Sequence, residues 1–355
     1  MTATSNLHPA HGKHNSPPHG GHHVSSTRHP APMHLVPDIF SEEVPKKPSR
    51  DGFGKALLEL GEKDPSIWAL SADVSESSRT HWFAERFPER FVQVGVAEQN
   101  MAGVAAGIAS CGKKAFISAF AAFSPGRNFD QIRVSICYSN LDVKIHASHA
   151  GLSVGPDGAS HQMLEDIAMI RALPNMAVLV PSDMEQAKKA TIAAASLKTP
   201  AYIRTSREKY PVFTTHETPF TIGKANVYRD GKDVAIFACG LQVFESLKAA
   251  EELKKKGIDA AVIDMHTIKP IDKETIIRYA EQCGALVSAE DHQINGGLGG
   301  AIAEVLCSGF PVPLVRVGVK DTFGESGSAK ELFKKYGIDA AAIEKAAEEV
   351  LKVKK

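Results

Sequence analysis

The feature of this sequence that most constrains its fold is a regular alternation of short apolar runs with longer helical stretches. From residue 50 onward, runs of about five residues rich in Val, Ile, Ala and Phe are typical of buried strands. The stretches between them carry apolar residues at helical spacing. This alternation predicts an α/β fold, with mostly parallel sheets covered by helices on both faces.

The alternation falls into two successive sets, which predict two open sheets. The first set has expected strands at 67–71, 91–95, 115–120, 143–148, 177–181 and 201–204, with helices at 98–109, 128–138, 163–172 and 184–195. The second has expected strands at 234–239, 260–265, 285–289 and 314–319, with helices at 244–255, 273–282, 298–307 and 343–350. A less regular, polar stretch over 208–233 separates them. We therefore expect one domain over 48–212 and another over 222–352.

Residues 1–36 differ from the rest of the chain in composition. They are rich in His, Pro, Gly and Ser, and they hold eight of the fifteen histidines. With few large apolar side chains, such a segment buries too little surface to offset the entropy lost on ordering. We expect a disordered, His-rich tail. Weak metal binding is the alternative, although no spacing of these histidines defines a coordination geometry.

The overall composition argues against several classes of partner. Lys+Arg and Asp+Glu number 41 each, so the net charge offers no general attraction to nucleic acid or to an anionic membrane. No apolar run approaches the roughly 20 residues that span a bilayer, and the start lacks the apolar core of a secretory signal. The five cysteines form no CxxC pair and lie in or beside apolar stretches. We expect buried, reduced thiols in a cytoplasmic protein.

Polar and aromatic residues follow several of the expected strands, at the positions where open parallel sheets bind ligands. This group comprises Asp73, Ser75, Ser77, Glu98, Phe120, Phe123, His149, Asp157, His161, Arg204 and Arg207. Taken singly, each has a structural alternative. Glu98 is suited to capping a helix, the phenylalanines to a core, and Arg207 to the surface. Their joint placement at strand ends favours a binding site.

The glycine-rich run Gly296-Gly-Leu-Gly-Gly300 resembles a phosphate-binding loop before a helix. It lacks a full GxGxxG pattern and a ribose-binding acid at the expected distance. Close packing of a strand against a helix is therefore the preferred interpretation. The sequence also contains no HExxH or Cys/His zinc pattern, and no Ser-His-Asp arrangement can be recognised by spacing.

Several motifs occur in the order and at the spacing of a known family. The motifs resembling the pyrimidine-binding domain of transketolases are Ser71-Ala-Asp-Val74, Gly95-Val-Ala-Glu-Gln-Asn-Met101, Gly155-Pro-Asp-Gly-Ala-Ser-His-Gln162, Pro174-Asn-Met176 and Pro181-Ser-Asp183. Two others, Thr267-Ile-Lys-Pro-Ile-Asp272 and Phe323-Gly-Glu-Ser326, resemble the transketolase C-terminal domain. The resemblance covers about residues 48–352.

The Gly-Asp-Gly motif with which transketolases bind the cofactor diphosphate does not occur in the sequence. The chain therefore resembles the C-terminal half of a split transketolase. The resemblance implies thiamine diphosphate as cofactor, with Mg²⁺ or Ca²⁺ held by a partner subunit that carries the Gly-Asp-Gly domain. It implies an α2β2 assembly, and it assigns no metal ligand to this chain.

The resemblance also implies roles for individual residues. Glu98 matches the acid that contacts the pyrimidine ring nitrogen of thiamine, and His161 matches a histidine beside the donor carbonyl. Phe120 and Phe123 match the aromatic wall of the pyrimidine site, and Phe129 is a candidate for a third aromatic. Arg50, Ser77, His149 and Arg207 match contacts to the sugar phosphate, and Asp157 matches a contact to a substrate hydroxyl.

The implied reaction is transfer of a two-carbon ketol unit from a ketose phosphate to an aldose phosphate, as in the pentose phosphate pathway. Two related enzymes are alternatives: the β subunit of a 2-oxo acid dehydrogenase-type decarboxylase, and a deoxyxylulose-phosphate synthase-like enzyme. The set of His149, Asp157, His161 and Arg207 favours a sugar phosphate. A non-catalytic regulatory subunit is a further alternative, which retention of Glu98 disfavours.

Overall fold

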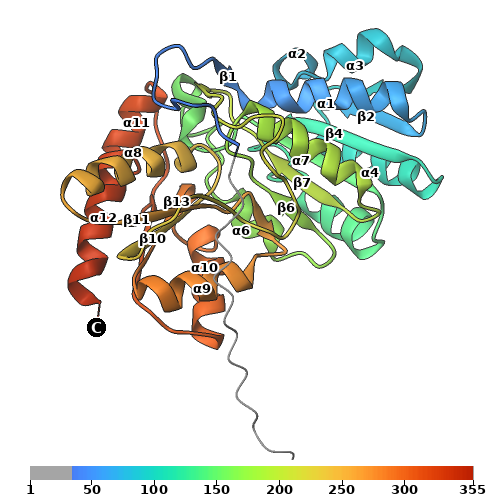
Figure 1. Ribbon diagram of the computed structural model, residues 1–355. Coiled ribbons are helices and arrows are strands. Elements are labelled where there is room, and N and C mark those ends of the chain that lie inside the picture. Colours follow the sequence, from blue (N-terminus) through green and yellow to red (C-terminus); the bar gives the residue numbers. More distant parts are fainter. Residues whose placement is uncertain (1–33, 355) are drawn as a thin grey trace, which may run out of the picture. The chain divides into compact units, whose positions relative to one another are not determined.

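The apolar runs pair as predicted in the computed structural model, which describes residues 34–354 (Figure 1). The first sheet has the order β12-β6-β7-β5-β4-β2-β3. Its strands are β2 (Ile67–Ser71), β3 (Phe91–Gln93), β4 (Lys114–Phe120), β5 (Val143–Ser148), β6 (Ala177–Leu179), β7 (Ala201–Arg204) and β12 (Thr267–Lys269). All pairings are parallel except that of β12 with β6. The central strands are buried on both faces, which explains their continuous apolar sequence.

Helices and short turns connect the strands of the first sheet. They are α1 (Ser49–Lys63), α2 (Ser75–Ser78), α3 (His81–Arg86), η1 (Pro88–Arg90), α4 (Glu98–Ser110), α5 (Phe129–Gln131), η2 (Ile132–Tyr138), η3 (Leu152–Asp157), α6 (Asp166–Arg171) and α7 (Met184–Ser196). The helix expected over 128–138 is instead a short α-helical turn followed by the π-helix η2. The carboxyl ends of β2, β4, β5 and β7 lead into α2, the segment 121–128, η3 and the segment 205–208.

The second sheet has the order β14-β13-β10-β11-β9. Its strands are β9 (Asn226–Arg229), β10 (Val234–Ala238), β11 (Ala260–Asp264), β13 (Leu286–Gln293) and β14 (Leu314–Val319). The accompanying helices are α8 (Gln242–Lys255), α9 (Lys273–Cys283), α10 (Leu298–Ser308), α11 (Ala329–Lys335) and α12 (Ala340–Val353). Only β9 pairs antiparallel within this sheet. The predicted fold class, two successive mostly parallel α/β sheets, is therefore confirmed.

Three features of the strand pairing were not predicted. Strand β12 follows β11 of the second sheet, but it joins the edge of the first sheet beside β6. Strands β1 (Lys46–Pro48) and β8 (Lys209–Pro211) form a separate antiparallel pair, and β9 lies within the stretch expected to be irregular. Each of these strands has only three or four residues, too few for a periodic apolar pattern to identify.

The predicted disordered tail falls mostly on residues 1–33, which lie outside the described residues. Its expected end at residue 36 is wrong. Leu35 forms a β-bridge with Thr214, and the Val36 amide donates to the Phe213 carbonyl at 3.0 Å. The partners of this segment lie almost 180 residues away, so its local composition gave no sign of the pairing.

The prediction for the cysteines holds in part. Cys137, Cys239 and Cys283 are buried thiols, whereas Cys111 and Cys307 are free but exposed. Cys111 directly follows α4, and Cys307 lies in the last turn of α10. Among the described residues, no helix is long and apolar enough to span a membrane.

The run 296–300 packs a helix against a strand, as the preferred interpretation predicted. A Cβ on Gly297 would lie 1.9 Å from Oε2 of Glu290. The Glu290 carboxylate accepts the amides of Leu298 and Gly299 at 2.7 and 2.9 Å. A carboxylate of the chain itself therefore occupies the N-terminus of α10, where a phosphate would meet a like charge.

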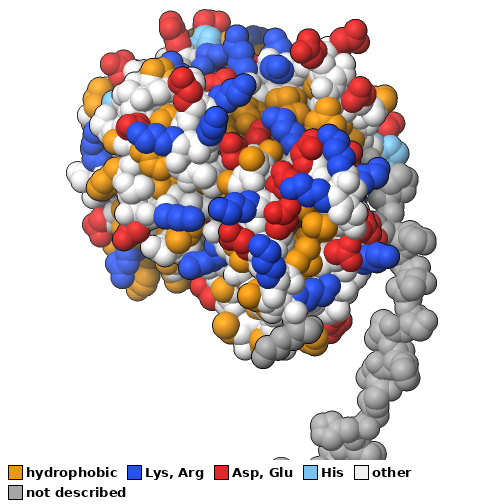
Figure 2. All heavy atoms as spheres, turned by 90° about the vertical axis from the view of Figure 1, so that its left-hand side faces the viewer, with side chains coloured by type: hydrophobic (Ala, Val, Ile, Leu, Met, Phe, Trp, Pro, Cys, Tyr) orange, Lys and Arg blue, Asp and Glu red, His pale blue; other side chains and the backbone are white. Residues whose placement is uncertain are grey.

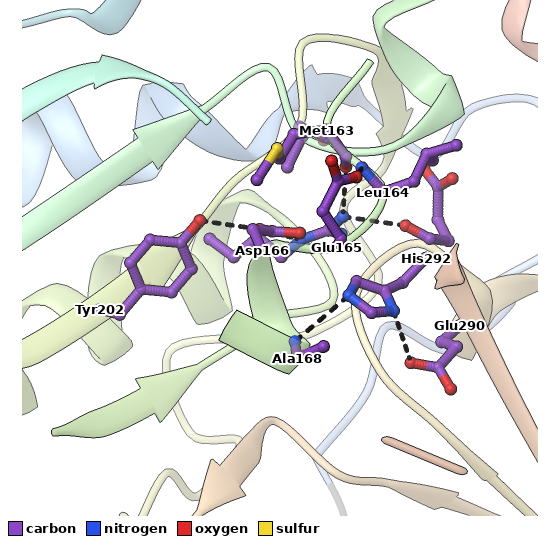
Figure 3. Close-up of polar contacts among 12 residues, drawn as sticks. Met163, Leu164, Glu165, Asp166, Ala168, Tyr202, Glu290 and His292 are labelled. Carbon is purple, nitrogen blue, oxygen red and sulfur yellow. Dashed lines mark hydrogen bonds and ion pairs between the residues drawn. The ribbon is translucent and has the colours of Figure 1, made fainter. Parts of the chain in front are cut away.

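Buried charged groups join the two sheets at the end of β13 (Figure 3). Tyr202 and Arg204 on β7 donate to Oδ2 of Asp166 at 2.7 and 2.8 Å. The His292 ring lies between the Ala168 amide, 3.4 Å from Nε2, and Glu290, 3.6 Å from Nδ1. Burial alone would raise the pKa of Asp166, but Arg204 and His292 bring it below its usual value.

A second buried carboxylate at the junction of the sheets, Asp264 on β11, should make stability depend on pH. Burial is the main cause that raises its pKa from 3.8 to about 7, although Gln186 and Tyr228 donate to its Oδ2. Between these values the folded chain binds more protons than the unfolded chain. This group therefore lowers the free energy of unfolding as pH rises, by up to about 1.4 kcal/mol per pH unit.

The substitution Asp264→Asn removes the titrating group, so it should flatten this dependence. Denaturant unfolding of both proteins across the range from 3.8 to about 7 measures the difference in slope. Equal slopes for the two proteins would show that Asp264 keeps an ordinary pKa in the folded chain.

Candidate active site

The predicted site residues lie beyond the carboxyl ends of the strands of the first sheet. Phe120 is the last residue of β4, His149 directly follows β5, and Arg207 lies three residues beyond β7. Glu98 is the first residue of α4. Because β2, β4, β5 and β7 run parallel, their carboxyl ends meet at one edge of the sheet. The topology thus gathers these residues there.

Four of the predicted residues form an aromatic cluster at this edge. The rings of Phe120 and Phe123 stack with their centroids 5.9 Å apart. The imidazole of His149 stacks on Phe120 at 3.8 Å, and that of His161 meets Phe123 edge-on at 5.3 Å. Stacked, partly exposed rings form a surface suited to a flat heterocycle.

Glu98 is buried beside this cluster, with an exposed fraction of 1%. Its carboxylate does not cap α4, although it stands at the start of that helix. Instead, Oε2 accepts a hydrogen bond from Nη1 of Arg127 at 2.6 Å. No hydrogen bond to Oε1 occurs among the described residues. One carboxylate oxygen is therefore left for another group.

Arg127 was not singled out as a site residue from the sequence, but the structure brings it into the site. Its guanidinium carbon lies 4.6 Å from the ring centroid of Phe123. The neighbouring Asn128 is buried, and it donates through Nδ2 to the Glu98 carbonyl at 3.2 Å. The segment 124–128 thus packs against the acid.

Phe129 does not join the aromatic cluster. It begins α5, and its partly buried ring packs against the hydrophobic core of the first sheet. Within residues 34–354, its ring makes no aromatic contact with Phe120 or Phe123. Its place in the site thus rests on the resemblance alone.

A cluster of cationic groups lies next to the aromatic cluster. Nη1 of Arg50 donates to the Ser77 carbonyl at 2.8 Å and lies 2.9 Å from Nε2 of His149. Nε of Arg50 is buried and has no partner among the described residues. Burial and the charge of Arg79 lower the pKa of Arg50 to about 10. Arg79, which the sequence did not reveal, is thus part of this cluster.

The same cluster keeps His149 neutral. Burial first, and then Arg50 and Arg207, lower its pKa from 6.5 to about 2. Positive groups that repel one another in this way are the environment in which a bound anion is stabilised, and forked guanidinium groups match a phosphate. The arrangement is therefore suited to the phosphate of a substrate.

The loop at η3 holds the remaining predicted residues. Arg207 donates through Nη1 to Oδ1 of Asp157 at 2.8 Å and to the Val154 carbonyl at 3.0 Å. His161 follows this loop, and its Nδ1 lies 2.9 Å from Oγ of Ser160. Asp157 and Arg207 thus contact each other directly, a pairing that their spacing of fifty residues could not show.

The residues present match only part of thiamine diphosphate. A buried carboxylate with a free oxygen and two stacked phenylalanines match an aminopyrimidine ring. In contrast, residues 34–354 contain no group of three or more His, Cys, Asp or Glu residues that would hold a metal ion.

A separate cavity of about 650 Å³ lies between the second sheet's helices and the segment 39–46. Its lining includes Phe40, Phe244 and Phe333, together with lysines and acidic residues in similar number. Figure 2 shows the face on which α8 and α12 lie, where groups of both charges are interspersed. Nothing in this mixture selects a particular ligand.

Two family models match the chain. Residues 46–212 match the pyrimidine binding domain of transketolase, and residues 223–343 match the transketolase C-terminal domain. A putative transketolase C-terminal section from Methanocaldococcus jannaschii is 47% identical over 309 residues, covering 86% of this chain and 97% of the relative. A 6-deoxy-6-sulfo-D-fructose transketolase subunit from a Clostridium species is 43% identical over 301 residues, covering 85% and 94%.

Solved structures agree with these matches. A split-gene transketolase, described as an inactive β4 tetramer, has 46% identity and a TM-score of 0.82, with 87% of this chain and 99% of that chain covered. A transketolase from Campylobacter jejuni shares the fold at 23% identity and a TM-score of 0.74, with 89% of this chain and 49% of that chain covered. The chain belongs to the transketolase family. Within that family it carries the pyrimidine-binding and C-terminal domains and is similar to C-terminal sections and subunits of split transketolases.

The cationic cluster generates a prediction for the isolated chain. Inorganic phosphate should bind at Arg50 and Arg207 and raise the melting temperature. Arg207→Gln should weaken this binding at least about 10-fold, because a charge-assisted hydrogen bond is lost. Arg229→Gln is the control, since Arg229 lies on β9 of the second sheet and pairs with Glu251 of α8. Titration calorimetry measures both, and equal affinities of the two variants would contradict the assignment.

Proposed function

We propose that this chain is the β subunit of a thiamine-diphosphate-dependent transketolase that moves a two-carbon ketol unit from a ketose phosphate to an aldose phosphate. The observation that carries the proposal is a buried carboxylate, Glu98, beside the stacked rings of Phe120 and Phe123. The cationic side chains of Arg50 and Arg207, with the neutral imidazole of His149 between them and the aromatic cluster, complete it. One site thus combines groups for an aminopyrimidine with groups for a phosphate.

Glu98 would act on the cofactor through its free oxygen. When bound, thiamine diphosphate supplies a carbon nucleophile and an electron sink. Oε1 of Glu98 would share a proton with the pyrimidine ring nitrogen, while Arg127 holds Oε2 at 2.6 Å and fixes the plane of the carboxylate. Phe120 and Phe123 would orient the ring and exclude water from its face. Phe129 remains a candidate third aromatic.

The other predicted residues would bind and orient the sugar phosphate. Arg50, Arg207 and His149 would hold the phosphate, with Ser77 at the same edge. Asp157 would accept a hydrogen bond from a substrate hydroxyl after exchanging its contact with Arg207. His161 would move a proton at the donor carbonyl, because an imidazole can donate or accept near neutral pH.

A partner subunit would complete the enzyme. It would carry the Gly-Asp-Gly domain and hold the diphosphate with Mg²⁺ or Ca²⁺, for which the described residues offer no metal-binding group. An α2β2 assembly in the cytoplasm is proposed. Two observations support a partner: the chain covers 97% of a relative described as a transketolase C-terminal section and 94% of one described as a transketolase subunit, and the similar split-gene β chain forms a tetramer described as inactive.

The preferred sugar does not follow from the family alone, because similar subunits are named for different substrates. One is named for 6-deoxy-6-sulfo-D-fructose and another, 38% identical over 304 residues, for apulose 4-phosphate. Both names describe sugars with an anionic end group. The cationic cluster supports an anionic sugar, and we propose a phosphate because the guanidinium forks match its oxygens.

The assembled enzyme tests this proposal. With its partner, thiamine diphosphate and a divalent metal, the chain should transfer a ketol unit from xylulose 5-phosphate to ribose 5-phosphate. The chain by itself should be inactive under the same conditions. Decarboxylation of pyruvate without ketol transfer would instead support the decarboxylase or synthase alternatives, and assembly without either reaction would support a regulatory subunit.

The role of Glu98 gives a further prediction. Glu98→Gln should lower kcat by a factor of about 10² to 10⁴, because the amide cannot exchange a proton with the ring nitrogen. Assembly should persist, since the side chain keeps its size. The control is Glu165→Gln, at an exposed acid whose carboxylate accepts the Leu164 amide at 2.9 Å. Near-normal turnover of Glu98→Gln would remove this residue from catalysis.

A further inference from the structure

The loop that carries Asp157 is held by the second half of the chain. The amides of Leu152 and Ser153, at the start of η3, donate to the carboxylate of Asp291 at 2.8 and 3.3 Å. Asp291 lies on β13 of the second sheet, whereas the loop follows β5 of the first. A carboxylate that accepts two consecutive backbone amides forms stronger hydrogen bonds than a neutral acceptor would.

A glycine makes this approach possible. Gly151 has φ of +80°, and a Cβ at that position would lie 2.2 Å from Oδ2 of Asp291. No other residue could occupy the position without displacing the carboxylate. Gly151, at the start of the loop that follows β5, thus has a specific partner on the second sheet.

Asp291 is itself fixed in place. It is 4% exposed, and its backbone carbonyl accepts a hydrogen bond from Nη2 of Arg204 at 2.9 Å. The same guanidinium binds Asp166 through Nε at 2.8 Å. Figure 3 shows the surrounding contacts, in which Tyr202 points to Asp166 and Glu290 lies beside His292. Buried hydrogen bonds through Arg204 therefore fix the position of the Asp291 carboxylate next to the loop.

A second contact from the same half supports the end of the loop. Nε2 of Gln162 donates to the carbonyls of Gly155 and Glu325, at 3.2 and 2.9 Å. Glu325 belongs to the run Phe323-Gly-Glu-Ser326, which the proposed chemistry leaves without a role. The loop is therefore held at both ends by segments of the second half.

The loop so held presents groups of the proposed site. Between its two supports lie the Val154 carbonyl and the Asp157 carboxylate, which both accept from Nη1 of Arg207. His161 directly precedes the supporting Gln162. A shift of the loop would therefore move Asp157, Arg207 and His161 together. Misplacement of reacting groups by about 1 Å can cost roughly 100-fold in rate.

We propose that Asp291 is a positioning residue, through which the second half of the chain sets the conformation of the substrate loop 151–162. It touches neither cofactor nor substrate, and it acts through the amides of Leu152 and Ser153. The assignment rests on the proposed function only in that Asp157, His161 and Arg207 are substrate groups. The hold on the loop is a property of the chain itself.

Asp291→Asn tests the hold on the loop without requiring activity. The asparagine has nearly the same shape, but its amide nitrogen would face one of the two backbone amides, and its charge is gone. Hydrogen exchange of the full-length chain should show the amides of 151–162 exchanging at least about 10-fold faster than in the wild type.

Asp183→Asn is a matched control for this measurement. Asp183 is also buried, and its Oδ2 accepts the consecutive amides of Phe213 and Thr214 at 2.9 and 2.7 Å. This variant should speed exchange around 213–214 and leave 151–162 as in the wild type. Equal exchange of 151–162 in the two variants would overturn the proposal.

A second variant tests the same contact in case Asp291→Asn does not fold. Gly151→Ala should expel the Asp291 carboxylate and speed exchange of the same loop. The double variant should be no worse than the more affected single variant, because both changes remove one contact. Fully additive effects would show that Gly151 and Asp291 act separately, which would also overturn the proposal.

The assembled enzyme then separates a positioning role from a purely structural one. Asp291→Asn should lower kcat/KM for the phosphorylated donor by about 100-fold, with affinity for thiamine diphosphate unchanged. Loss of cofactor affinity in the same proportion would mean a general structural role and contradict the proposal. If the wild-type assembly transfers no ketol unit, the proposed function fails, and hydrogen exchange still decides whether Asp291 holds the loop.

Discussion

The buried guanidinium of Arg204 is the interaction on which the rest of this structure depends. It ends β7 of the first sheet, binds Asp166 at the start of α6, and donates to the Asp291 carbonyl on β13 of the second sheet. Burial alone would lower its pKa, but the neighbouring Asp166 and Asp291 raise it above the usual value. Removing one partner would leave an unpaired charge in the interior, which is far more costly than the pair itself. The junction therefore tolerates little change.

In the candidate active site, several cationic side chains lie close to one another, whereas opposite charges pair at the junction of the sheets. At the junction Arg204 pairs with Asp166, whereas in the site burial and neighbouring cations lower the pKa of Arg50 and of His149. Such a cluster is unfavourable without an anion, and it becomes favourable when an anion binds. The buried groups at the junction of the sheets thus maintain the structure, and the cationic groups of the candidate site are suited to bind an anion. The loop 151–162 contacts both sets, through Asp291 and through Arg207.

Much of the site could be predicted because its residues follow strands. Glu98, Phe120, Phe123, His149 and Arg207 all stand next to elements that the apolar pattern reveals, and parallel pairing then brings them together. The sequence could not reveal Arg79 or Arg127, which come from irregular turns. It also suggested Phe129 as an aromatic of the site, although that ring packs against the core. In an irregular segment, the apolar pattern does not predict which way a side chain points.

The sequence by itself determined the α/β class, the two sheets and the family, because apolar periodicity and motif spacing are local properties that a single chain displays directly. Only the tertiary structure decided which distant groups touch. It placed β12 on the first sheet, Leu35 beside Thr214, and the Asp291 carboxylate under the loop at Gly151. Contacts between residues about ninety or more positions apart depend on how both sheets pack, and no local pattern carries that information.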